Sequence, residues 1–328
     1  MTDKTRAYDL GEFGLIGRIR ELFPEIDLTD DCALIKTPES SEMILTIDAG
    51  IRGTHFPADS KFMLDAGWRT MAGAVSDINA SGGIAISALL ALQIPEDFLL
   101  ADFDDFIRGV RTFVDWSNVP LHGGNITRGK DFSATVSVIG SVKKYIGRNG
   151  AKAEQILFVS GTVGGSEAGR MIAVGEIDSK SISSEICNEL ISRYMRPSPT
   201  LGLGEKLAGI GVSSMIDISD GLLADTAHIA KTSGGGIIID LDKLPLHPGL
   251  VKLAKILNID SAQIAPISGE EFELIGTMPA ENFAHARKIA LEMDSDLTII
   301  GKTTSKTGIQ IIREGRRVDF DYMGWRHF

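Results

Sequence analysis

The stretch MIDISDGLLAD, residues 215–225, determines how the second half of this chain is interpreted. An apolar run is interrupted by Asp217, Ser219 and Asp220, Gly221 follows, and helix-favouring residues come next. We expect a strand that ends at Asp217 and a helix that begins near Gly221. Such a strand-to-helix junction commonly binds a phosphate, because free backbone N–H groups and the helix dipole point into it. Here the junction has two fixed negative charges and no lysine, so a phosphate would need cations between itself and the protein.

The composition is that of a globular protein with a net negative charge. The chain has 328 residues, 43% hydrophobic content and a formal net charge of −11, so it can form two domains and is a poor candidate for non-specific nucleic-acid binding. Cys32 and Cys187 lie too far apart to form a redox or metal-binding motif, which indicates a reducing compartment. The first residues lack the apolar core of a signal peptide, and no apolar run is long enough for a membrane span. We therefore expect a cytoplasmic protein that binds neither membranes nor nucleic acid.

Helical and extended patterns alternate along the chain, which is typical of an α/β protein. Besides the strand that ends at Asp217, the expected extended segments are 43–48, 85–93, 119–122, 132–142, 156–160, 237–242, 297–302 and 308–312. The expected helices are 61–81, 103–116, 165–175 and 182–194, with a further helix after RPSPT (196–200). The polar, glycine-bearing segment 147–155 indicates a domain boundary, which divides the chain into residues 1–149 and 150–328.

Common catalytic motifs are incomplete or missing. The segment GNITRGKD, 124–131, has the glycine and lysine spacing of a P-loop, but Asp131 stands where a Mg²⁺-binding hydroxyl is required. The turn GTVGGS, 161–166, lacks the spacing of a dinucleotide-binding fingerprint. No H-x-x-x-H pair and no G-x-S-x-G elbow occur, so zinc hydrolysis and serine hydrolysis are unsupported.

Acidic residues recur near the ends of apolar runs along the chain. They are Asp30, Asp31, Asp48, Asp77, Asp217, Asp220, Glu270, Glu271 and Glu273. Any one of them could be a helix cap, a turn former or a solvated surface residue. As a group they favour bound cations, because carboxylates that lie near one another repel unless cations separate them. Oxygen ligands without histidine or cysteine suit Mg²⁺, which proteins commonly bind together with substrate phosphates, so we expect phosphoryl transfer.

A glycine pair is a second indication of phosphate chemistry. Gly123 and Gly124 follow the short extended segment 119–122 and would allow the backbone to approach a phosphate closely. Arg128 and Arg148 are candidate phosphate partners through bidentate contacts, and each could equally be an ordinary surface arginine.

The order of these motifs resembles that of the thiamine-monophosphate kinase family, which belongs to the aminoimidazole-ribonucleotide synthetase superfamily. The matching segments extend nearly from end to end. They are GEFGLIGRI (11–19), DDCALI (30–35), GTHF (53–56), SDINASGG (76–83), GGNITRG (123–129), RNGAK (148–152), RPSP (196–199), IDISDGL (216–222), SGEEFEL (268–274) and GWRHF (324–328). IDISDGL and the GEF start are the most specific to this family, whereas the DD and GG elements are shared more widely.

The resemblance implies a two-domain α/β fold. The N-terminal domain would bind ATP and several Mg²⁺ ions, and its sheet would pair with that of a second subunit in a homodimer. The C-terminal α/β domain would complete the active site. The implied reaction transfers the γ-phosphoryl group of ATP directly to thiamine monophosphate, giving thiamine diphosphate. Because the phosphate acceptor is already anionic, cations and positioning rather than a strong base would provide catalysis.

The same resemblance implies roles for individual residues. The implied catalytic residues are Asp48, Asp217 and Asp220. The implied metal ligands are Asp31, Thr46, Ile47, Asp48, Asp77, Asn125, Asp217 and Asp220, with Ile47 offering only its backbone carbonyl. The implied nucleotide contacts are Gly124, Asn125, Arg148 and Ser219. The implied substrate contacts are His55, Glu270 and Trp325, of which Trp325 could instead be a packing anchor.

Five positions depart from the pattern of the family, among them Thr29 and Ser268, where glycine is common. The family usually has aspartate where this chain has Asn125, threonine where it has Ile47, and aspartate where it has Glu271. The first two changes fall at one metal position and remove one negative charge, so a metal there would bind more weakly. Two alternatives stay open: a related enzyme that phosphorylates a different small acceptor, and a nucleotide-binding regulator without catalytic activity.

Overall fold

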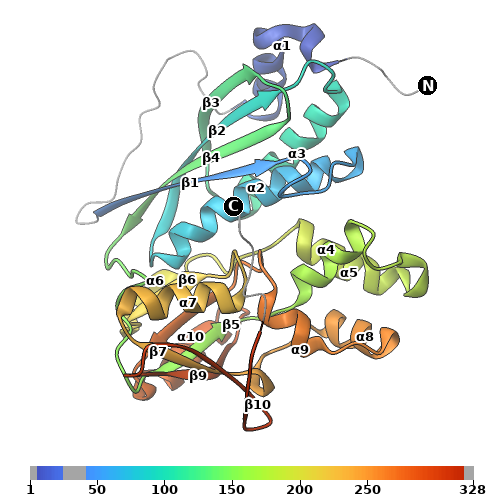
Figure 1. Cartoon of the computed structure of the whole chain (residues 1–328). Coiled ribbons are helices and arrows are strands. Elements are labelled where there is room, and N and C mark those ends of the chain that lie inside the picture. Colours follow the sequence, from blue (N-terminus) through green and yellow to red (C-terminus); the bar gives the residue numbers. More distant parts are fainter. Residues whose placement is uncertain (1–5, 25–41, 321–328) are drawn as a thin grey trace. The chain divides into compact units, whose positions relative to one another are not determined.

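The computed structural model describes residues 6–24 and 42–320 (Figure 1). The chain divides into two compact units. The first consists of the chain up to Ile78 together with Ile84–Ser141, and the second of Asn79–Gly83 together with the chain from Val142 onward. The segment 147–155, where the sequence predicts a domain boundary, lies near the start of the second unit. The division of roles between residues 1–149 and 150–328 stays a prediction.

The first unit is built on a four-stranded sheet with the strand order β1-β4-β2-β3. Its strands are β1 (Glu42–Ile51), β2 (Ile84–Ile94), β3 (Leu121–Arg128) and β4 (Ser133–Val142), and its helices are α1 (Ala7–Leu22), α2 (Met63–Ala80) and α3 (Leu100–Ser117). Side chains of β4 alternate strictly between buried and half-buried, as expected for a sheet with one covered face. Helices α2 and α3 cover that face, where Ile78 packs on Gly140 and the ring of Phe106 lies 5.0 Å from that of Phe132 (Figure 1).

Helices α2 and α3 approach each other closely through two glycines. A Cβ atom at Gly109 would lie 1.8 Å from the carbonyl oxygen of Leu64, and one at Gly67 would lie 2.0 Å from that of Phe106. No real side chain tolerates such distances, so each glycine is required for the two backbones to pack. The position of α2, and with it that of Asp77, depends on this contact.

The second unit contains a seven-stranded sheet with the order β11-β10-β7-β9-β5-β8-β6. Its strands are β5 (Ile156–Ser160), β6 (Ser214–Asp217), β7 (Gly236–Asp240), β8 (Leu274–Met278), β9 (Leu297–Thr304), β10 (Gly308–Arg313) and β11 (Arg316–Val318). Its helices are α4 (Gly165–Ala173), α5 (Ser184–Met195), α6 (Leu203–Ile210), α7 (Leu222–Ser233), α8 (Pro248–Leu257), α9 (Ser261–Ile264) and α10 (Phe283–Leu291). Neighbouring strands pair antiparallel except β7 and β10, which pair in parallel.

Both faces of this second sheet are covered. Met215 and Leu274 contribute to a core with α6 and α10, whereas Ile216 and Ile275 point to the opposite face and a larger core with α4, α5, α7 and α8. Because both faces are covered, all four residues of β6 are buried, rather than every second one. The strand ends at Asp217, which places a carboxylate at the C-terminal end of β6.

Most expected elements lie within a few residues of their predicted bounds. The clearest difference is β3, which was predicted to end at 122 and instead extends through GGNITR to Arg128. Pairing with β2 overrides the weak strand preference of glycine and asparagine there. Helix α1 was not predicted, because its sequence contains three glycines and a weak apolar periodicity. Among the described residues, no helix has the length and apolar composition needed to cross a bilayer.

We expect Gly109→Ala to lower the free energy of unfolding of the first unit by about 3 kcal/mol, because the added methyl group would force α2 and α3 apart. Urea unfolding measures the change. Gly17→Ala in α1 is the matched control, since a Cβ atom there would meet nothing within 4 Å. It should be neutral or stabilise by up to about 1 kcal/mol. Equal effects of the two variants would contradict the close helix contact.

Candidate active site

Predicted site residues gather at the junction between β6 and α7. Asp217 is the last residue of β6 and only 2% exposed, while Ser219 and Asp220 are half-buried. Gly221, with a φ of 129°, turns the chain into α7 at Leu222. The strand, the turn and the helix predicted from MIDISDGLLAD are therefore present.

A residue that the sequence analysis missed organises this junction. The Oδ2 atom of Asp225 accepts the backbone N–H groups of Ser219, Asp220 and Gly221 at 3.0, 3.1 and 3.2 Å. Burial raises the pKa of Asp225 well above its usual range, and the charges of Asp217 and Asp220 raise it further, while the hydrogen bonds from Ser219 and Gly221 oppose them. The N–H groups that could have held a phosphate are thus bonded to a carboxylate of the same chain.

His228 places a ring nitrogen, a potential metal ligand, beside the same cluster. It lies one turn after Asp225 on α7, and its ring is exposed. One potential ligand atom from each of Asp220, Asp225 and His228 lies within 4.8 Å of the other two. The sequence could have indicated this pair, because Asp225 and His228 are three residues apart and therefore lie on one face of the helix.

The loop 268–273, with the predicted substrate contact Glu270, lies against this junction. The N–H of Glu270 donates to the carbonyl of Ser219 at 2.8 Å, and the N–H of Phe272 donates to that of Ile218 at 3.0 Å. Glu270 and Phe272 both have a φ of 52°, in the left-handed region that non-glycine residues seldom adopt. Each such residue costs on the order of 1 kcal/mol or more, so surrounding contacts must hold the loop.

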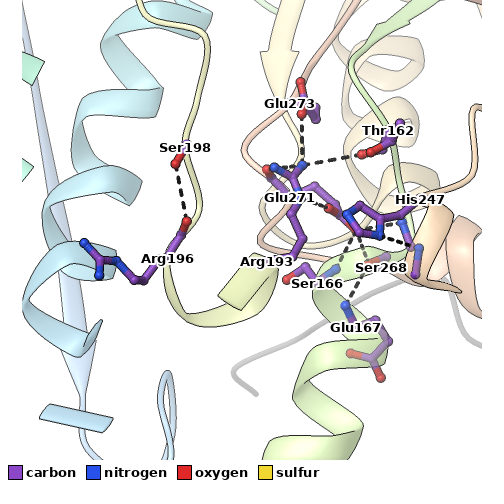
Figure 2. A network of polar contacts seen from close by, with 12 residues as sticks. Thr162, Ser166, Glu167, Arg193, Arg196, Ser198, His247, Ser268, Glu271 and Glu273 are labelled. Carbon is purple, nitrogen blue, oxygen red and sulfur yellow. Dashed lines mark hydrogen bonds and ion pairs between the residues drawn. The ribbon is translucent and has the colours of Figure 1, made fainter. Parts of the chain in front are cut away.

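A buried glutamate supplies part of that hold (Figure 2). Glu271 is 1% exposed, and its Oε1 atom accepts the N–H groups of Gly164 and Ser166 at 2.7 and 3.1 Å and the hydroxyl of Ser268 at 2.6 Å. The N-cap residue of α4, Gly164, has no side chain to cap the helix, and the carboxylate of Glu271 caps it instead. Glu271, where the family usually has aspartate, therefore holds the loop 268–273 in place. Its carboxylate binds the first N–H groups of α4.

Arg193 of α5 joins the two glutamates of the loop (Figure 2). Its Nε atom donates to Glu271 at 3.1 Å and its Nη2 atom to Glu273 at 2.9 Å, and the same Nη2 atom bonds to the carbonyl of Glu271. Burial alone would lower the pKa of Arg193, but the charges of Glu271 and Glu273 more than offset it, so the pKa is raised. We call Arg193, Glu271 and Glu273 the buried clamp.

Other predicted residues lie together in the first unit, around β1. The hydroxyl of Thr46 donates to Asp77 of α2 at 2.6 Å, which joins two predicted metal ligands. Asp48 is exposed on the same strand, two residues further along and hence on the same face. The Nδ1 atom of His55 accepts the N–H of Ile51 at 3.0 Å, so the neutral ring has its proton on Nε2.

Gly124 and Asn125 lie on β3, at the opposite edge of the sheet from β1. The pairing with β2 shifts by one residue between Leu121 and Gly124, which marks a bulge just before Gly124. Three strand spacings, roughly 14 Å, separate Asn125 from β1. Within one chain the structure therefore does not bring Asn125 to Ile47, the other changed residue of the predicted metal position.

The remaining predicted residues lie apart or outside the described part of the chain. Arg148 is exposed, and its carbonyl accepts the hydroxyls of Thr232 and Ser233 at the C-terminal end of α7, whereas Asp220 precedes the N-terminal end. Arg128 forms an exposed ion pair with Glu96 at 2.8 Å, as an ordinary surface arginine would. Asp31 and Trp325 are outside the described residues.

The donor groups in both units fit Mg²⁺. Carboxylate, hydroxyl and carbonyl oxygens predominate, and these are the ligands that hard divalent cations prefer. In the second unit Asp217 and Asp220 each disfavour the charged form of Asp225, and a cation would relieve that effect. In the first unit Thr46 and Asp77 already lie within hydrogen-bonding distance, so both oxygens can face one ion.

Two protein-family models match most of the chain. The family model "AIR synthase related protein, N-terminal domain" matches residues 29–142, and the corresponding C-terminal domain model matches residues 155–314. The two sheets and the acidic groups around β1 and β6 thus belong to a two-domain protein of the AIR synthase related class.

Individual relatives narrow the assignment. Thiamine-monophosphate kinase of Aquifex aeolicus is 32% identical over 323 residues, which cover 98% of this chain and 100% of that protein. The structure of AaThiL complexed with AMPPCP and TMP shares 30% identity over 99% of both chains, with a TM-score of 0.79. Thiamine-monophosphate kinase from Stenotrophomonas maltophilia shares 30% identity over 94% of this chain and 98% of that chain, with a TM-score of 0.80. The chain belongs to the thiamine-monophosphate kinase family.

We expect Glu271→Gln to lower the free energy of unfolding of the second unit by about 3 kcal/mol, because Arg193 would lose one of its two buried carboxylate partners. The matched control is Glu176→Gln, which removes an exposed partner of Arg170 in the same unit and should change stability by less than about 0.5 kcal/mol. Urea unfolding at neutral pH compares the variants. A Glu271→Gln protein as stable as the control would show that the buried clamp does not hold the loop.

Proposed function

We propose that this protein, a phosphotransferase, transfers the γ-phosphoryl group of ATP to thiamine monophosphate and so forms thiamine diphosphate. The observation that supports this most directly is the intact β6–α7 junction, with Asp217, Ser219 and Asp220 beside the Glu270 loop. Full-length similarity to thiamine-monophosphate kinases agrees with it. A related protein is known in complex with AMPPCP, an ATP analogue. Use of ATP fits a cytoplasmic location.

In this proposal each unit contributes one group of Mg²⁺ ligands. Thr46, Asp48 and Asp77 form the group of residues 1–149, which also supply nucleotide contacts. Asp217 and Asp220 form the group of residues 150–328. Mg²⁺ held by these residues would supply positive charge that offsets the negative charge of the phosphates during transfer.

The residues of the chain act by binding and orienting. Ser219 would contact the nucleotide through its hydroxyl, because its N–H donates to Asp225. Glu270 would contact the acceptor and is held beside the junction by its bond to Ser219. The acceptor phosphate is ionised at neutral pH, so the reaction needs alignment of donor and acceptor more than it needs a base.

We propose further that the protein is a homodimer formed through the open face of the first sheet. Met43, Leu45 and Ile47 of β1 and Leu89 of β2 are 40%, 75%, 68% and 42% exposed, although α2 and α3 cover the opposite face. An apolar face this exposed on a sheet with an edge strand can be covered by the same face of a second subunit. Pairing would also supply a second β3 edge, so that the partner's Asn125 could complete the metal position at Ile47.

An ADP-release assay with thiamine monophosphate and saturating Mg²⁺ tests the reaction. The wild-type protein should turn over, and Asp217→Asn should reduce kcat at least ~100-fold, because it removes a charge that orients the cation. Asp240→Asn is the matched control, an aspartate at the end of another strand of the same sheet, and should retain activity. ATP binding without turnover would indicate a regulator, and turnover only with other acceptors a different kinase. Either result would contradict the proposed reaction.

Sedimentation velocity tests the dimer. Leu45→Glu should convert the protein to monomers, since it places a charge in the proposed apolar interface. Leu291→Glu, at a 55% exposed leucine of the other unit, should leave the dimer unchanged. A wild-type monomer, or a Leu45→Glu dimer, would refute this interface.

A further inference from the structure

We infer that Asp225 is a positioning residue that turns an anion-binding junction into a cation-binding one. The inference rests on the proposed function in one respect, the use of Asp217 and Asp220 as cation ligands. The Oδ2 atom of Asp225 itself faces the backbone N–H groups of residues 219–221.

The geometry of the junction is that of an anion site. Three successive N–H groups, those of Ser219, Asp220 and Gly221, converge on one oxygen at 3.0 to 3.2 Å. Such convergent N–H groups ahead of a helix bind phosphate in many proteins. Here the Oδ2 atom of Asp225 occupies that position, and Asp225 is 1% exposed. A phosphate therefore has no donors left to bind at this point.

The chemical identity of the side chain that accepts the three N–H groups determines the charge at the junction. An asparagine, serine or threonine oxygen could accept the same N–H groups, as at ordinary helix N-termini. A carboxylate can instead carry a third negative charge beside Asp217 and Asp220, and the three N–H groups that donate to its Oδ2 atom favour this ionised form. The polyphosphate of a nucleotide is repelled by this group and attracted only when divalent cations lie between them.

Asp225 also fixes the direction of the ligands. Its bonds hold the backbone of Ser219 and Asp220, the two residues whose side chains must face the nucleotide and the metal. The loop 268–273 holds the same segment from the other side through the carbonyls of Ile218 and Ser219. The segment is thus bonded through its N–H groups and through its carbonyl groups.

Asp225→Asn separates charge from hydrogen bonding, because the amide oxygen can still accept the N–H groups. Mn²⁺ binding without nucleotide, followed by electron paramagnetic resonance, should weaken about tenfold, with a small change in melting temperature. In the ADP-release assay, the Mg²⁺ concentration for half-maximal rate should rise about tenfold and kcat at saturating Mg²⁺ should change less than threefold. Asp178→Asn, which removes an exposed capping carboxylate elsewhere in the unit, should change none of these values. Unchanged Mn²⁺ affinity in folded Asp225→Asn would overturn the inference.

A measurement on the wild-type protein keeps the inference testable if Asp225→Asn does not fold. Inorganic phosphate is added without divalent cations, and the amide resonances of Ser219, Asp220 and Gly221 are followed by NMR. They should not shift, because Asp225 occupies their N–H groups. Saturable shifts at these three amides would overturn the inference. Neither binding measurement depends on turnover, so an inactive wild-type protein would refute the proposed reaction without deciding this question.

Discussion

Three backbone N–H groups bonded to one buried carboxylate fix the junction on which the rest of the site depends. The bonds from Ser219, Asp220 and Gly221 to Asp225 set the backbone between β6 and α7. These bonds leave none of the three N–H groups for a phosphate. The acidic side chains of Asp217, Asp220 and Asp225 lie around the same junction. Binding of an anionic nucleotide at such a place requires cations, which is the chemistry expected of this family.

A second buried interaction holds the loop that lies on this junction. Arg193 binds Glu271 and Glu273, and Glu271 at the same time caps α4. These contacts keep Glu270 in a left-handed conformation that it would not adopt alone. The two interactions act in the same way. In each, a buried ionisable side chain forms several hydrogen bonds and thereby fixes the conformation of a loop.

The sequence predicted what depends on local pattern. The apolar run before Asp217 and the glycine after Asp220 were sufficient to place β6 and the start of α7. Long-range contacts were not predictable in this way: Glu271 bonds to Gly164, which is 107 positions earlier in the chain. The separation of Asn125 from β1 was also hidden, because the order of motifs does not reveal that β1 and β3 are opposite edges of one sheet.

Calorimetric titration with AMPPCP, in Mg²⁺ and then in EDTA, tests the central claim most directly, since the analogue resembles ATP without being turned over. The account predicts saturable binding in Mg²⁺ and affinity at least ~100-fold weaker in EDTA, because the acidic groups at the β6–α7 junction repel a bare polyphosphate. Equal affinity in the two conditions would contradict it, since the nucleotide would then be bound by the protein itself rather than through cations.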